Sequence, residues 1–140
     1  VTLHHSSLST CIFGILASRI GRHEDAYTYF AQSARMDLDD YHDNFYAGIH
    51  AANMAGTWQS IVFGFAGLRL VNGVPEFKFY IPEAWNGYHF TVKIKRSVLA
   101  VDVLPDGWTI TLQSGDAVNF LVEGKPYKLT EKGATCHEAL

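Results

Sequence analysis

The chain has 140 residues, of which 48% are hydrophobic and 18% charged, and its formal net charge at pH 7 is −3. This weak negative charge gives no electrostatic reason to expect nucleic acid or a membrane as a partner. One domain is the default for this length, although every lysine lies at or after Lys78 and an acidic run spans residues 37–43, which hints at two segments.

Three stretches of the first 66 residues have helical periodicity, and residues 37–47 between the second and third are predicted to be a polar loop. One helix is predicted over residues 9–20, capped by Ser9 or Thr10 and ended by Gly21, and a second over residues 24–36. Their short connection predicts an antiparallel pair, and a third helix is predicted over residues 49–65. The expected apolar positions are Ile12, Ile15, Leu16 and Ile20; Tyr27, Phe30, Ala31 and Ala34; and Ala51, Ala52, Met54, Ala55, Trp58, Ile61, Val62 and Phe65.

The third predicted helix is apolar on most of its sides. Two other helices hardly supply enough partners to cover it, so residues 1–66 are expected to belong to a larger helical assembly. If the chain is isolated, we expect it to self-associate through residues 9–66.

After Gly67 the hydrophobic period changes to two, which indicates an antiparallel β-sheet module or small sandwich. The predicted strands cover residues 77–81, 90–95, 98–104, 108–113 and 119–123. Turn signals separate them at Asn86-Gly87, Pro105-Asp106-Gly107, Ser114-Gly115-Asp116 and Gly124-Lys125-Pro126.

Three residues are candidate anion contacts. Ser6 and Ser7 precede the first helix, where serines more often cap the helix, although two hydroxyls beside free helix N–H groups also suit phosphate. His50 lies among small residues at a helix start; a packed core histidine is the commoner case, and contact with an anion is the alternative.

Other candidates favour structural roles. The run 37–43 is acidic, but His42 and Gly48 stand where a calcium loop requires glycine and glutamate, so a solvated or helix-capping loop is favoured. Asp43 at its end, or the next residue, Asn44, is a candidate hydrogen-bond partner for a neighbouring loop. The aromatic residues of the β-part form either a sugar-stacking surface or, more commonly, a sheet core; they include Trp85 and Trp108.

Two cysteines, Cys11 and Cys136, do not indicate a disulfide framework, and Cys136-His137 has no partner pair for a zinc site. No apolar run is long enough and uninterrupted enough to cross a membrane, and no basic region precedes residues 11–17 as in a signal peptide. We therefore expect a reduced, cytoplasmic protein without a metal site.

Four blocks of sequence together resemble glycoside hydrolase family 65. They are residues 5–9, 37–40, 48–58 and 64–69, which read HSSLS, DLDD, GIHAANMAGTW and GFAGLR. Residues 81–85, IPEAW, resemble the start of the C-terminal sheet domain of that family.

The resemblance implies an α+β fold and a C-terminal fragment of a longer enzyme. Residues 1–66 would be the last helices of an (α/α)6 catalytic barrel, and residues 67–140 the small C-terminal β-domain. The family holds inverting disaccharide phosphorylases that act on maltose, trehalose, kojibiose and nigerose. The implied reaction converts a disaccharide and inorganic phosphate, the co-substrate, into β-glucose 1-phosphate and glucose, with no other cofactor.

By matching motifs, Ser6, Ser7 and His50 would contact phosphate in the full-length parent, which we expect to be a homo-oligomer. The general-acid glutamate lies upstream in the family and matches no glutamate here, so the chain alone is expected to be inactive. A non-catalytic carbohydrate-binding or assembly module is the alternative from another class. A hydrolase of the same family is disfavoured, since inverting hydrolysis needs a second carboxylate where His50 would stand.

Overall fold

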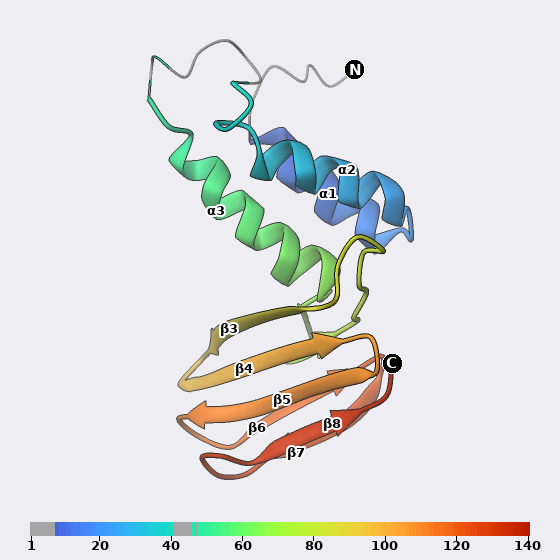
Figure 1. Cartoon of the computed structure of the whole chain (residues 1–140). Coiled ribbons are helices and arrows are strands. Elements are labelled where there is room, and N and C mark those ends of the chain that lie inside the picture. The colour runs from blue at the N-terminus through green and yellow to red at the C-terminus, as the bar shows by residue number, and fades with distance from the viewer. Residues whose placement is uncertain (1–7, 41–45, 47) are drawn as a thin grey trace. The chain divides into compact units, whose positions relative to one another are not determined.

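The computed structural model describes residues 8–40, 46 and 48–140, which fall into two compact units, Val1–Phe65 and Ala66–Leu140 (Figure 1). The first unit holds helices and the second holds β-sheets that are mostly antiparallel, so the predicted α+β class is confirmed. None of the helices formed by the described residues is both long and apolar enough to cross a bilayer.

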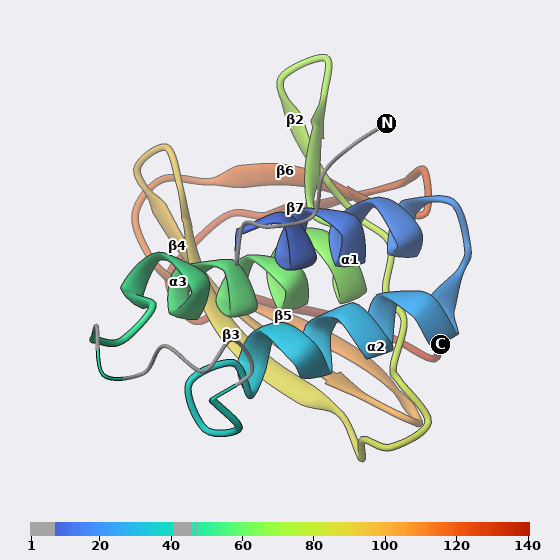
Figure 2. The same cartoon turned by 90° about the horizontal axis from the view of Figure 1, so that it is seen from above.

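The helical unit contains α1 (Ser9–Arg19), α2 (His23–Ala34) and α3 (Ala51–Gln59), and α3 continues into the π-helix η2 (Ser60–Phe65). Helices α1 and α2 run side by side in opposite directions, as their short connection predicts (Figure 2). The change to π-helical pairing after Gln59 is not predicted by the sequence. In this last stretch Ser18 Oγ donates to the carbonyl oxygen of Gly64 at 2.8 Å, which ties η2 to α1.

The two ends of α1 are formed in different ways. Leu8 occupies the N-cap position without a side-chain hydrogen bond, and Ser9 and Thr10 lie inside the first turn, so the predicted capping is wrong. The C-terminal end follows the prediction. Gly21 has a φ of +80°, which glycine adopts without strain, and donates from N–H to Ser18 at 3.1 Å, while Arg22 N–H donates to Ala17 at 2.9 Å.

The helices pack through small and polar side chains, not through the apolar stripes that the sequence indicates. The buried set includes Cys11, Gly14, Ala26, Ser33, Asn53, Gly56 and Ser60. Several large apolar side chains are instead between 43% and 72% exposed: Ile12, Leu16, Ile20, Met54 and Trp58. Of the predicted apolar positions, Ile15, Val62 and Phe65 are buried.

Close approach of α1 and α3 explains this arrangement. A Cβ atom added to Gly56 would lie 2.6 Å from Cys11 Sγ and 3.0 Å from Cys11 Cβ, closer than unbonded atoms pack. The two helices meet where one of them has no side chain at all, and larger residues are therefore turned away from the contact.

The β-unit contains eight strands: β1 (Arg69–Val71), β2 (Val74–Phe77), β3 (Tyr88–Ile94), β4 (Ser97–Leu104), β5 (Gly107–Ser114), β6 (Val118–Val122), β7 (Lys125–Leu129) and β8 (Thr135–Glu138). They form two sheets with the strand orders β1-β2-β6-β7 and β3-β4-β5-β8. Strands β2 and β6 pair in parallel, with Phe77 beside Val122, and the other neighbouring pairs are antiparallel.

The predicted hairpin at Pro105-Asp106-Gly107 is confirmed, with Leu104 paired to Gly107 across the turn. The predicted strand over residues 77–81 is wrong, because β2 ends at Phe77 and residues 78–87 have no strand structure. The predicted turn at Gly124-Lys125-Pro126 is shifted. The two residues of that turn are Glu123 and Gly124, with φ of +50° and +81°, and the next residue begins β7.

A closed ring of five aromatic side chains joins the two sheets. In order around the ring, the centroid distances are 5.5 Å for Phe77–Phe79, 5.8 Å for Phe79–Trp108, 5.1 Å for Trp108–Tyr127, 5.4 Å for Tyr127–Phe120 and 6.1 Å for Phe120–Phe77. Trp108 comes from β5 of one sheet, and three of the others come from strands of the other sheet. Two of these pairs are stacked, two are edge-on and one is tilted, and such pairs add to the energy of apolar burial.

Glu138 forms a second connection between the sheets. Its carboxylate, on β8, accepts hydrogen bonds from Lys125 Nζ and Tyr127 Oη, both on β7. The hydrogen bond from the Lys125 ammonium, followed by that from Tyr127, lowers the pKa of Glu138 below its ordinary value. The same contact raises the pKa of Lys125.

We predict that Gly56→Ala destabilises the helical unit by about 1–3 kcal/mol, because α1 must move away from the added methyl group. Gly64→Ala is the matched control: its Cβ would lie 3.7 Å from the nearest atom, Ile15 Cα, and alanine favours helix over glycine. Urea denaturation followed by circular dichroism at the helical band measures both. Adding Cys11→Ala should restore part of the loss, and equal stabilities of the two glycine variants would contradict the close contact.

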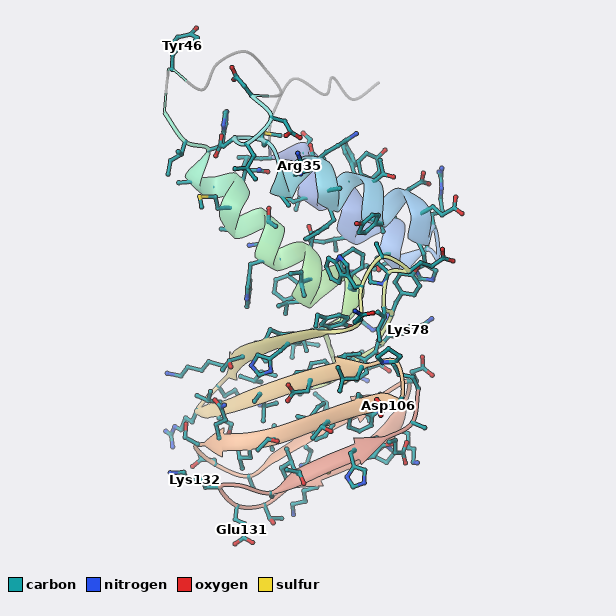
Figure 3. The ribbon with its side chains drawn as sticks, viewed as in Figure 1. Arg35, Tyr46, Lys78, Asp106, Glu131 and Lys132 are labelled. Atoms are coloured by element: carbon teal, nitrogen blue, oxygen red, sulfur yellow. The ribbon has the colours of Figure 1, made fainter. Side chains whose placement is uncertain are left out.

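A second prediction concerns pH. The pKa of Glu138 is lowered in the folded state. Its contribution to the free energy of unfolding is therefore complete above the ordinary glutamate pKa, and it is lost as the pH falls through the lowered pKa. Glu138→Gln should therefore lower the urea midpoint of the β-unit near neutral pH, and the difference from wild type should close in acid. Glu131→Gln is the control, since Glu131 points away from the strands (Figure 3). A gap between wild type and Glu138→Gln that stays unchanged as the pH is lowered through the whole acidic range in which carboxylates titrate would refute the assignment.

Candidate functional site

The described candidate site lies at the start of α3, where His50 is the N-cap residue. The carbonyl oxygen of His50 accepts hydrogen bonds from Asn53 N–H at 2.8 Å and from Met54 N–H at 3.2 Å. Ala51 N–H donates to the carbonyl of Ile49 at 3.0 Å. Three amides at this helix start are thus used within the chain.

Asp37 holds the His50 ring on one side. Its Oδ1 lies 2.5 Å from His50 Nδ1, and its Oδ2 accepts a hydrogen bond from His50 N–H at 3.0 Å. The hydrogen bond with the His50 side chain is the main cause that lowers the pKa of Asp37. Both side chains are only partly exposed, 21% for His50 and 25% for Asp37. The pair is therefore fixed within the fold yet still open to solvent.

The turn that carries Asp37 is itself held by a bidentate ion pair. Arg35, which follows the last residue of α2 (Figure 3), donates from Nε and Nη2 to the two carboxylate oxygens of Asp39 at 2.7 and 2.6 Å. The backbone N–H of Asp39 also donates to the Arg35 carbonyl at 2.9 Å. The hydrogen bonds with Arg35 lower the pKa of Asp39. Residues 35–39 form a closed turn with Asp37 at its centre.

A buried polar cluster fixes α3 against α2 one turn beyond His50. Ser33 Oγ donates to Asn53 Oδ1 at 2.7 Å, and Asn53 Nδ2 donates to the Ser33 carbonyl at 2.5 Å. Thr57 Oγ1 lies 3.3 Å from Ser33 Oγ and donates to the Asn53 carbonyl at 3.0 Å. Asn53 and Ser33 are each 2% exposed, so loss of one partner would leave a buried polar group unsatisfied.

The structure brings together His50, a predicted site residue, and Asp37, which was predicted only as part of a solvated or helix-capping loop. Ser6 and Ser7 lie outside the described residues, as do Asp43 and Asn44, and the structure places His50 beside Asp37. The run was predicted to be a solvated or helix-capping loop; within it, the Asp37 carboxylate accepts a hydrogen bond from the N–H of His50, the N-cap residue of α3. The acidic run indicated a solvated or helix-capping loop, but no sequence pattern indicated that Asp37 contacts the His50 ring.

The remaining candidates are the tryptophans proposed for sugar stacking and the possible metal ligands. Trp108 is 3% exposed inside the aromatic ring, so it offers no face for stacking on a sugar. Trp85 is partly exposed and packs edge-on against Tyr88 at 6.1 Å. Throughout the described part of the chain, no group of three or more histidine, cysteine or acidic side chains is placed to hold a metal ion.

Comparison with known proteins places these features in a family. The model of the glycosyl hydrolase family 65 central catalytic domain matches residues 1–59, and that of the glycosyl hydrolase family 65 C-terminal domain matches residues 68–129. The first match contains the helices with the Asp37–His50 pair, and the second contains most of the β-unit. The chain belongs to glycosyl hydrolase family 65.

Curated relatives include an α,α-trehalose phosphorylase of Thermoanaerobacter brockii, 43% identical over 95% of this chain, and one of Geobacillus stearothermophilus, 40% identical over 94%. In each case the chain spans 17% of the length of the relative. A solved structure from the human microbiome, described as a kojibiose phosphorylase, superposes with a TM-score of 0.89 and 37% identity, covering 99% of this chain and 18% of that one. The resemblance to family 65 is thus confirmed over both units.

Proposed function

We propose that this chain supplies part of the phosphate site of an inverting disaccharide phosphorylase. The observation that carries the proposal is the His50 ring, held by Asp37 at the start of α3 within the segment that matches the catalytic-domain model. Relatives that carry the name trehalose phosphorylase or kojibiose phosphorylase support the reaction class. The substrates are then a disaccharide and inorganic phosphate.

The chemistry of phosphorolysis accounts for a histidine at this position. The incoming phosphate is itself the nucleophile, so the protein must bind a dianion beside the anomeric carbon. A carboxylate there would repel it, whereas an imidazolium and hydroxyl groups attract it. His50 supplies the imidazole in this proposal, and Ser6 and Ser7 supply the hydroxyls.

The proposed reaction needs a general acid that this chain does not supply. A glutamic acid elsewhere in the catalytic domain protonates the glycosidic oxygen, the bond from that oxygen to the anomeric carbon breaks, and a phosphate oxygen forms a new bond on the opposite face. The products are β-glucose 1-phosphate and the released sugar. Residues 1–140 by themselves are therefore inactive in this proposal.

Exposed apolar side chains on α1 and α3 lead to a proposal about partners. Ile12 and Leu16 on α1 and its C-cap residue Ile20 are about half exposed or more, while Met54 and Trp58 are exposed on α3. Apolar surface of this kind favours association. We propose that the chain in isolation covers it by self-association, and that the full-length enzyme is a homo-oligomer.

We predict that His50→Ala raises the apparent KM for phosphate about 10–100-fold, the cost of one charge-assisted hydrogen bond, with little change in the KM for the disaccharide. The measurement needs a full-length enzyme, such as a chimera in which residues 1–140 replace the matching segment of the Geobacillus stearothermophilus trehalose phosphorylase. Initial rates are recorded against phosphate at fixed trehalose.

His89→Ala is the matched control for this experiment, because His89 Nδ1 meets Asp102 Oδ1 at 2.6 Å in a similar pair on the β-unit. It should leave the KM for phosphate unchanged. Residues 1–140 alone should release no sugar from trehalose with phosphate. Unchanged phosphate affinity and rate in His50→Ala would remove His50 from the site, and phosphate-independent release of glucose would indicate a hydrolase.

For self-association, we predict concentration-dependent oligomers of residues 1–140 in sedimentation velocity. The double variant Ile12→Lys/Leu16→Lys should weaken association about tenfold or more, because it places charge on the exposed stripe of α1. Leu70→Lys, at a site 68% exposed on β1, is the matched control and should have no effect. A monodisperse monomer at all concentrations would count against the proposal.

A further inference from the structure

The pairing of His50 with Asp37 determines which ring nitrogen can meet a ligand. An ionised carboxylate only accepts hydrogen bonds, so the contact of 2.5 Å between Asp37 Oδ1 and His50 Nδ1 requires the proton to be on Nδ1. Among the described residues, none forms a hydrogen bond with His50 Nε2. The second oxygen of Asp37 binds the backbone N–H of the same residue at 3.0 Å, so one carboxylate fixes both the ring and its backbone.

We propose that Asp37 is a positioning residue for phosphate: it holds the His50 ring through Nδ1 so that Nε2 is presented to the phosphate oxygen. This inference rests on the proposed phosphate role of His50. In the phosphate complex the ring is an imidazolium with two N–H groups. Each then meets an anion, Asp37 on one side and phosphate on the other. Asp37 does not touch the phosphate in this arrangement.

The local structure supports a preorganised role. The turn over residues 35–39 is closed by the bidentate Arg35–Asp39 pair, and the backbone of His50 is fixed by its N-cap position and by the Ser33–Asn53 cluster one turn further on. Both ends of the Asp37–His50 contact are therefore held independently of any ligand. A ring oriented in advance loses less entropy when the anion binds.

Asp37→Asn separates orientation of the ring from anchoring of the backbone. The asparagine side-chain oxygen can still accept the hydrogen bond from His50 N–H, so the stability of α3 should be retained. The amide, however, offers N–H donors as well as a carbonyl and carries no charge, so it no longer requires the proton on Nδ1. Asp102→Asn is the matched control, since Asp102 Oδ1 meets His89 Nδ1 at 2.6 Å in a similar pair on the β-unit.

Two measurements test the proposal. Nitrogen-15 NMR of residues 1–140, at a pH where the ring is neutral, should show His50 as the Nδ1–H tautomer in wild type and in Asp102→Asn, and a shift toward Nε2–H in Asp37→Asn. His50→Gln identifies the signals. In the chimera, Asp37→Asn should raise the KM for phosphate about tenfold with the melting temperature and the KM for trehalose nearly unchanged, and Asp37→Glu should restore part of the loss.

The outcomes separate this inference from the proposed function. If His50→Ala raises the KM for phosphate but Asp37→Asn changes neither that KM nor the tautomer, the positioning role is refuted and the phosphate site stands. If Asp37→Asn lowers stability and weakens both substrates equally, its role is structural and the inference is overturned. If His50→Ala has no effect on phosphate, the proposed function fails and the phosphate role of Asp37 fails with it, whatever the tautomer shows.

Discussion

The close contact between Gly56 and Cys11 is the constraint on which the helical unit depends. It brings the backbone of α3 so near to α1 that no side chain fits at the crossing. Most of the residues that face inward are then small or polar, and several large apolar residues of both helices, among them Ile12, Leu16, Met54 and Trp58, turn outward. The same approach places α3 beside α2, where Ser33 and Asn53 close a buried hydrogen-bonded cluster one turn from His50.

The positions of the helices were predictable from the sequence, but their inward faces were not. Periodicity located all three helices, and Gly21 ended the first of them as expected. The apolar stripe that includes Ile12 and Leu16 was the natural choice for the core, since burial usually follows hydrophobicity. A side chain such as Asn53 becomes buried only because Ser33 satisfies it, and that pairing depends on tertiary structure that no local pattern encodes.

In the β-unit, local sequence patterns correctly predicted a tight turn, but they predicted a strand where the side chains are buried for a different reason. The hairpin predicted at Asp106-Gly107 is present, because turn preferences depend on only a few neighbouring residues. Residues 77–81 alternate like a strand, yet Phe79 is buried through aromatic neighbours and without strand pairing. At the candidate site, the resemblance to family 65 pointed to His50, and the three-dimensional structure was needed to find Asp37 beside its ring.

The parallel pair β2–β6 has a consequence for how the β-unit folds. Strands β3, β4 and β5 lie between its two members in the sequence, and they join through tight hairpins into the other sheet. Hairpins close short loops and form quickly, whereas pairing β2 with β6 must close a loop that contains all of them. The topology therefore favours one order of events. The three strands β3, β4 and β5 form from local contacts and bring β6 back to β2, and β8 can join β5 only after the chain has passed through β6 and β7.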